Sequence, residues 1–273
     1  MSEYKLIPAR HVIIHGDCWP VVSAVQAVVK AIRPECRCEV ADSLPYLLQR
    51  LAGEPDAVLI LCLQPREHIY LFYALRNMLL DYPVLVISAE LLFNDRIVLH
   101  SWGDIPHASY CEIQTIVSGL RKFGHCPYPL KGKLAKFLSA PECVTGFFEV
   151  PMIFNNPKRL MRYMSLLMYR VTTSCGITRS QQKLLWALQK GHYSLPILTS
   201  ILNKNRKQIW QDKNRLLIKL GMKNRQYELL YGTAFCPDMQ RTAFISPANV
   251  KKLCCVEAPS EQENTLYPLS CGQ

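Results

Sequence analysis

The side chains best suited to chemistry in this sequence lie between positions 204 and 215, where positive and amide-bearing residues are interleaved. An amide side chain both donates and accepts hydrogen bonds, and Lys and Arg carry positive charge. Such groups suit the edges of nucleic-acid bases and the phosphates beside them. The residues that we select as a candidate DNA-contacting set are Lys204, Arg206, Lys207, Trp210, Gln211, Lys213, Asn214 and Arg215.

No other part of the sequence offers a comparable set of reactive groups. The seven histidines are not spaced to pair with a nucleophile or a metal, and the sequence has no glycine-rich phosphate loop. The close cysteine pairs, at 36 and 38 and at 254 and 255, lack the spacing of a zinc site. We therefore expect no catalytic residue, no metal and no cofactor, and we interpret the cysteines as reduced thiols. An enzyme is not expected.

Positive charge is concentrated in the same part of the chain. Residues 155–232 contain 15 lysines and arginines but only two acidic residues, a net charge of +13, whereas all 273 residues together carry +11. The remainder is therefore slightly acidic. A charge excess confined to one segment indicates a surface that attracts a polyanion such as double-stranded DNA.

A helix from about Asn205 to Leu220 must present these side chains, because Asn205 can cap its start and Gly221 can end it. At about 100° per residue the helix has an apolar and a polar face. The apolar face contains Ile209, Leu216 and Leu220, and the polar face contains Lys207, Gln211 and Asn214, flanked by Trp210 and Arg215. The polar face fits the major groove, whereas Lys204, Arg206 and Lys213 are better placed for phosphates.

Neighbouring helices are expected over 177–191, 195–202 and 224–231. The block resembles the LuxR/FixJ (NarL)-type helix-turn-helix on the following phrases: Ile177-Thr178, Leu184-Leu185, Gly191, Ile209 and Leu216-Leu217-Ile218-Lys219-Leu220-Gly221. One extra residue between Gly191 and Leu198 suggests an irregular turn. The resemblance implies DNA binding, but Trp210 stands where the family often has Lys, and Asp212 stands where His is common. The target sequence of relatives therefore does not transfer.

The first 123 residues alternate apolar runs with helical patterns. Residues 11–15, 57–63 and 83–88 are continuous apolar runs, as in strands buried on both faces, and 36–40 and 105–110 are weaker candidates. The expected fold is an α/β receiver-like domain with a five-stranded parallel sheet, followed by an all-α helix-turn-helix domain.

The segments 15–20 and 55–65 in this order resemble response-regulator receivers. That family phosphorylates an Asp that closes the third strand, but the matching position here is Leu61, with Cys62 as the neighbouring possibility. Only one residue of the family's acidic pair, Asp17, is present. Ser88 fits the family's hydroxyl position at the end of the fourth strand, but residues 104–110 contain no lysine to match the one that closes the family's fifth strand. The resemblance thus implies an atypical receiver without a phosphoacceptor. Asp17 and Ser88 form either a relic pocket that still senses a signal or a local cap and turn.

These patterns divide the chain into four parts. We expect a degenerate receiver-like domain over 1–123, a proline-rich linker over 124–157, the helix-turn-helix domain over 158–235, and a partly disordered tail over 236–273. No apolar run reaches the length of a membrane helix, and the first residues lack a signal-peptide pattern. A cytoplasmic protein without membrane contact is expected.

The expected function is sequence-specific transcription regulation without receiver phosphorylation, similar to regulators of the RcsA and BglJ type. The expected partners are double-stranded DNA and a second subunit, in a homodimer or a heterodimer with another LuxR/FixJ-type regulator, with RNA polymerase as a further candidate. Two alternatives stay open. The protein could respond to a small molecule or a second protein in place of phosphate, or it could be an adaptor that no longer binds DNA. Asp212 favours the adaptor, although its angle on the helix points it sideways.

Overall fold

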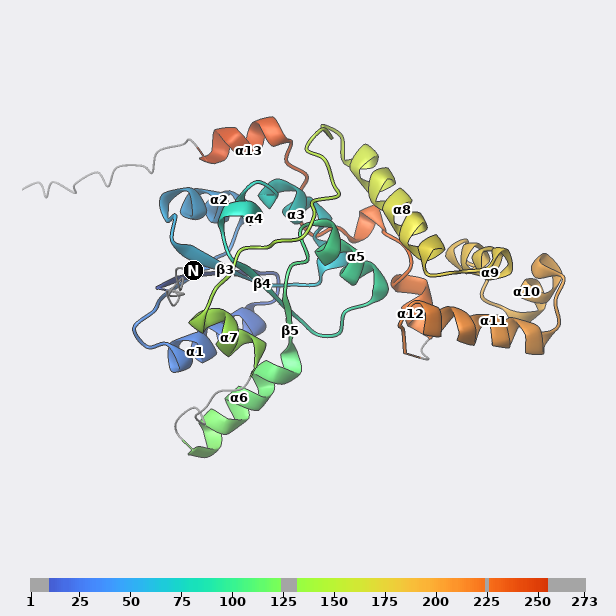
Figure 1. Ribbon diagram of the computed structural model, residues 1–273, viewed down its shortest axis with the longest axis horizontal. Helices are drawn as coiled ribbons and strands as arrows, with labels where there is room; N and C mark the ends of the chain where they lie inside the picture. The colour runs from blue at the N-terminus through green and yellow to red at the C-terminus, as the bar shows by residue number, and fades with distance from the viewer. Residues whose placement is uncertain (1–9, 124–131, 224–225, 255–273) are drawn as a thin grey trace, which may run out of the picture.

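The computed structural model describes residues 10–123, 132–223 and 226–254, and its N-terminal part is a parallel sheet of five strands in the order β2-β1-β3-β4-β5 (Figure 1). The strands are β1 (His11–Gly16), β2 (Arg37–Ala41), β3 (Ala57–Cys62), β4 (Val84–Ser88) and β5 (His107–Ser109). The central strands β3 and β4 are buried along their whole length, as their unbroken apolar sequences predict. The expected fold class is confirmed.

Helices cover both faces of the sheet, and successive strand residues point to opposite sides. Val12, Ile14 and Ile60 face one layer, and Ile13 and Leu59 face the other. The first layer consists of α1 (Trp19–Ile32), α6 (Tyr110–Phe123) and α7 (Lys133–Ser139). The second layer consists of α2 (Leu44–Gly53), the 3-10 turn η1 (Pro65–Glu67), α3 (Ile69–Leu75), α4 (Met78–Asp81) and α5 (Phe93–Ser101).

The segment expected to be an irregular linker is partly built into this domain. Helix α7 buries Leu134, Phe137 and Leu138 against the first layer. Residues 124–131 lie outside the described part. The proline-rich composition concealed α7 because a helix of seven residues is too short to show a clear period.

The helical C-terminal module consists of α8 (Pro157–Ser174), α9 (Arg179–Gln189), α10 (Leu195–Leu202), α11 (Arg206–Lys219) and α12 (Gln226–Tyr231). Helix α8 packs on α5. Leu160 and Met164 of α8 belong to the same buried cluster as Leu59 of the sheet and Leu184 of α9. The module therefore shares a continuous apolar core with the second layer of the sheet domain.

The chain then returns to the sheet domain. A 3-10 turn η2 (Pro237–Met239) leads to α13 (Pro247–Cys254), which lies on α2 (Figure 1). The expected tail is thus packed over residues 236–254, and its remaining residues, 255–273, lie outside the described part. No helix within the described ranges is long and apolar enough to cross a membrane.

Candidate nucleic-acid interface and pocket at the sheet edge

Helix α11 begins and ends at the residues that its sequence predicts. The Asn205 side chain accepts a hydrogen bond from the backbone N–H of Gln208, and the Gln208 side chain accepts one from the N–H of Asn205. Gly221 follows the helix at a φ of +59°, the left-handed conformation that favours glycine. Asn203 also has a positive φ, of +49°, and makes the sharp turn between α10 and α11. Helix-turn-helix geometry results.

The buried face of α11 contains Ile209, Leu216, Leu217 and Leu220. The candidate DNA-contacting residues occupy the remainder of the helix to different depths. Arg206, Lys207, Trp210 and Arg215 are exposed, whereas Gln211, Lys213 and Asn214 are half-buried. The Oδ1 atom of Asn214 is shielded from solvent and has no hydrogen-bond partner among the described residues. This amide must rotate to present both of its polar atoms to a ligand.

Lys204, predicted to contact phosphate, has partners within the module. Its Nζ contacts Asp212 and Ser180, and the Ser180 hydroxyl donates to the same Asp212 oxygen at 2.9 Å. Partial burial acts to raise the pKa of Asp212, but the hydrogen bonds from Lys204 and Ser180 outweigh it and lower that pKa. The Asp212 carboxylate therefore stays charged, and Lys204 balances its charge within the module. This agrees with the sideways angle predicted from the sequence.

Trp210 borders an apolar cavity of about 120 Å³ that opens to the core of the module. Tyr193, Leu195 and Lys213 also line this cavity. Tyr193 lies in the connection for which one extra residue was expected, between α9 and α10. The indole nevertheless keeps 60% of its surface exposed. Trp210 thus both borders the core and offers an aromatic surface to a partner.

Helix α5 of the sheet domain holds the C-terminal end of α11. The Arg96 guanidinium donates to the carbonyl oxygens of Leu220 at 2.5 Å and of Gly221 at 3.2 Å. A cation here satisfies the last carbonyls of α11 and complements its dipole. Neighbouring Asn94 donates to the carbonyl oxygens of Tyr231 and Ala234 at 2.6 and 2.9 Å. Nothing in the local sequence pattern indicated these contacts.

The end of β3 lacks the carboxylate of a receiver. Leu61 and Cys62 are fully buried, and Gly16 of β1 lies so close that a Cβ there would meet the Cys62 carbonyl oxygen at 2.4 Å. Burial raises the pKa of the Cys62 thiol to about 12, so this group stays neutral. No group of three or more His, Cys, Asp and Glu within the described ranges is arranged to hold a metal ion.

Ser88, at the expected hydroxyl position, is also fully buried. Its Oγ lies 3.0 Å from Nε2 of His107 on the neighbouring strand β5. Ser88 therefore has a local partner, as expected if it serves the structure of the strand end.

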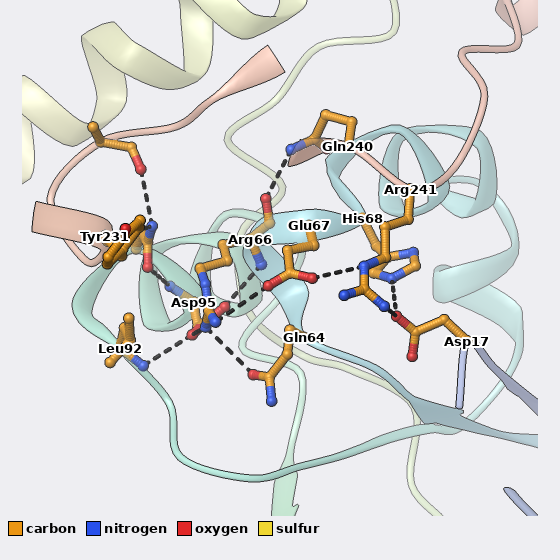
Figure 2. Close-up of polar contacts among 12 residues, drawn as sticks. Asp17, Gln64, Arg66, Glu67, His68, Leu92, Asp95, Tyr231, Gln240 and Arg241 are labelled. Carbon is orange, nitrogen blue, oxygen red and sulfur yellow. Dashed lines mark hydrogen bonds and ion pairs between the residues drawn. The ribbon is translucent and has the colours of Figure 1, made fainter. Parts of the chain in front are cut away.

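Asp17 is held by two groups that sequence reasoning missed. One Asp17 oxygen lies 3.3 Å from Nε2 of His68 and 2.6 Å from Nη1 of Arg241, whose Nε in turn lies 2.9 Å from Glu67 (Figure 2). Hydrogen bonding from His68, assisted by Arg241, lowers the pKa of Asp17. The Nδ1 atom of His68 pairs with the Thr242 hydroxyl at 2.8 Å. These partners come from residues more than 50 positions away, so no local spacing could reveal them.

We expect no stable phosphorylation of this pocket by acetyl phosphate in the presence of Mg²⁺. The acceptor position carries Leu61 and a neutral Cys62 thiol, and Asp17 already pairs with Arg241. Intact-mass measurement before and after incubation tests this, with a receiver that retains its acceptor Asp as the positive control. An acid-labile phosphate on any residue near Cys62 would contradict it.

His107 should make the sheet domain sensitive to mild acid. Burial, assisted by the charge of Lys133, lowers the pKa of His107 to about 4 from a usual 6.5. The unfolded chain therefore binds the proton first as the pH falls, so stability is fully present above pH 6.5 and decreases towards pH 4. Thermal unfolding across this range should be less pH-dependent in His107→Gln, whereas His192→Gln should keep the wild-type profile. Equal slopes for His107→Gln and wild type would refute this assignment.

No protein-family model matches the chain, and the comparison with curated proteins finds no match. Among solved structures, the chain is similar to an RcsB–DNA complex at 16% identity and a TM-score of 0.47, over 82% of this chain and 96% of the other. It is similar to RcsB from Salmonella enterica serovar Typhimurium bound to promoter rprA with phosphomimetic BeF₃⁻, at 16% identity and a TM-score of 0.43, over 82% and 98% of the chains. A structure of two RcsB dimers on two parallel DNAs gives 17% identity and a TM-score of 0.42, over 82% and 96%.

Proposed function

We propose that this protein is a sequence-specific, DNA-binding transcription regulator and not an enzyme. The observation that carries the proposal is the surface of α11, whose buried apolar face leaves Lys207 and Arg215 exposed and Gln211 half-buried on a module with a net charge of +13. A helix of this kind fits the major groove, where amides pair with adenine and cations pair with guanine. Arg206 and Lys213 are proposed to contact phosphates.

An adaptor that does not touch DNA is the weaker candidate. It drew support from Asp212, because a carboxylate facing phosphate would reduce affinity. Because Asp212 pairs with Lys204 and Ser180, its negative charge is already balanced, and this support for the adaptor becomes weaker. We therefore propose that Lys204 contributes more to the stability of the module than to phosphate binding.

One observation supports a second candidate function, that of a regulator that responds to a ligand. A cavity of about 340 Å³ lies at the carboxyl ends of β1 and β2, where open α/β sheets often bind ligands. His15, Asp42 and Arg241 are among its lining residues.

The function is tested by selecting sites for the full chain from random double-stranded DNA. Enrichment of one sequence motif is the expected result, and recovery of random sequence at all salt concentrations would reject sequence-specific binding. Because phosphate contacts are electrostatic, the affinity for any DNA should fall as salt rises. Selection without acetyl phosphate should give the same motif, since regulation is proposed to be independent of receiver phosphorylation.

The active form is proposed to be a homodimer or a heterodimer with another LuxR/FixJ-type regulator. One module covers roughly 600 to 1,000 Å² on DNA, which seldom suffices for operator-grade affinity. We expect markedly tighter binding to two half-sites about one helical turn apart than to one half-site. Sedimentation of the complexes gives the stoichiometry, and a single protein chain with equal affinity on both DNAs would contradict dimeric binding.

A further inference from the structure

A continuous chain of polar contacts joins the C-terminal segment to the anchor of the α8–α12 module (Figure 2). Arg241 pairs with Glu67, and Glu67 pairs with Arg66 at 3.2 Å. Arg66 reaches Asp95 at 2.6 Å, and the backbone N–H of Asp95 donates to the neighbouring Asn94 side chain at 3.0 Å. Asn94 then donates to the carbonyl oxygens of Tyr231, the last residue of α12, and of Ala234.

Most of this chain lies away from water. The side chain of Asp95 is fully buried, and Asn94 and Glu67 are buried as residues. Asp95 also accepts hydrogen bonds from the backbone N–H groups of Arg66 and Leu92 at 2.8 and 2.9 Å. Buried charges are tolerated only with their partners in place, so displacement of one member leaves the next without compensation.

The segment that supplies Arg241 is fixed along its length. The Gln240 side chain donates to the Arg66 carbonyl oxygen at 2.8 Å and accepts from the Ile69 N–H at 2.9 Å. The Arg241 N–H donates to the Glu67 carbonyl oxygen at 2.9 Å. Three residues on, the Phe244 ring packs on Tyr73 and on a second tyrosine, with centroids 5.9 and 5.5 Å apart. This segment thus engages both η1 and α3.

Arg241 also balances the negative charges of two carboxylates. It lies between Asp17, which follows β1, and Glu67 in η1, and it is within ion-pair distance of both. Without it, these two carboxylates would keep only His68 and Arg66 as basic partners among the described contacts. The cation that balances the sheet edge is therefore supplied by the far end of the chain.

We propose that residues 236–254 act as an intramolecular strap that fixes the position of the α8–α12 module. Through Arg241, the strap stiffens η1, and η1 stiffens α5 through the Arg66–Asp95 pair. Helix α5 then holds the ends of α11 and α12 through Arg96 and Asn94. The strap thereby holds one arrangement of the module on the sheet domain. Only the description of the module as DNA-binding rests on the proposed function.

Hydrogen exchange of the full chain without DNA tests the strap directly. Arg241→Ala should raise exchange in two regions that it does not touch, residues 92–101 and 228–235, by roughly 2- to 30-fold, the range of energetic couplings between linked sites. Lys251→Ala, an exposed substitution in the same segment, should change neither region. Arg241→Lys keeps the charge but cannot pair with both carboxylates, so an intermediate effect is expected even if the alanine variant folds poorly.

Two results would overturn the proposal. One is faster exchange confined to 236–254, and the other is unchanged exchange everywhere in Arg241→Ala and Arg241→Lys. A double-mutant cycle with Asn94→Ala adds a second criterion, because a common chain of contacts requires non-additive effects. Since DNA is absent from these measurements, failure of the proposed DNA binding would leave their outcome unchanged.

Discussion

Substitution of Gln211 and Asn214 together by alanine is expected to abolish recognition of the selected DNA site while leaving weak binding to unrelated DNA intact. At about 100° per residue both amides point away from Ile209 and Leu216, both are half-buried, and neither carries a charge that phosphate would attract. Each bidentate pair with a base contributes about 1 to 3 kcal/mol of discrimination, so loss of two should reduce specific affinity by roughly 30- to 20,000-fold.

Competition gel shifts with specific and random DNA measure this difference. Asn155→Ala, a substitution of an exposed amide outside α11, serves as the matched control and should bind as the wild type does. Unchanged affinity for the selected site in the double variant would refute the assigned reading face. An equal loss on both DNAs would instead show that these amides contribute affinity without sequence information.

The second large effect is expected at Asp95. Its carboxylate is fully buried and accepts three hydrogen bonds, two of them from Arg66. Asp95→Ala leaves the Arg66 guanidinium, whose side chain is only 17% exposed, without its main partner. Removal of one member of a buried pair typically costs about 3 to 5 kcal/mol.

Urea unfolding of the full chain measures the loss at Asp95. The control is Asp104→Ala, since Asp104 pairs with His100 at an exposed position, where an ion pair contributes at most about 1 kcal/mol. A loss below 1 kcal/mol for Asp95→Ala would mean that the contacts of Arg66 with Gln64 and Glu67 suffice without the carboxylate.

The sequence predicted the elements whose signals are local. Helix α11 follows from Asn205 and Gly221, which form its two ends, and β3 follows from its unbroken apolar run. The absence of a carboxylate at the end of β3 also follows from one strand, because Leu61 and Cys62 belong to that apolar run and are buried. That this strand end is a receiver site without its acceptor stays a prediction.

Contacts between distant segments could not be predicted in the same way. Arg241 is 224 positions from Asp17 and belongs to a stretch without hydrophobic periodicity. The contact of Lys204 with Asp212 escaped the sequence for a related reason: helical angles place Asp212 sideways but do not reveal that a residue before the helix reaches it. The DNA-contacting set, Lys204 included, stays a prediction, since the structure gives only the positions of its members on α11 and in the turn before it.

The return of the chain to its first domain also orders events during synthesis. The sheet is complete once β5 has been made, at residue 109, but the cation for Asp17 and Glu67 lies at residue 241. At about 5 to 20 residues per second, the ribosome reaches Arg241 roughly 7 to 26 seconds later. A sheet that folded during that interval would present two acidic groups and the aromatic surface that Phe244 later covers. Such a nascent chain would offer chaperones a surface that the finished molecule hides.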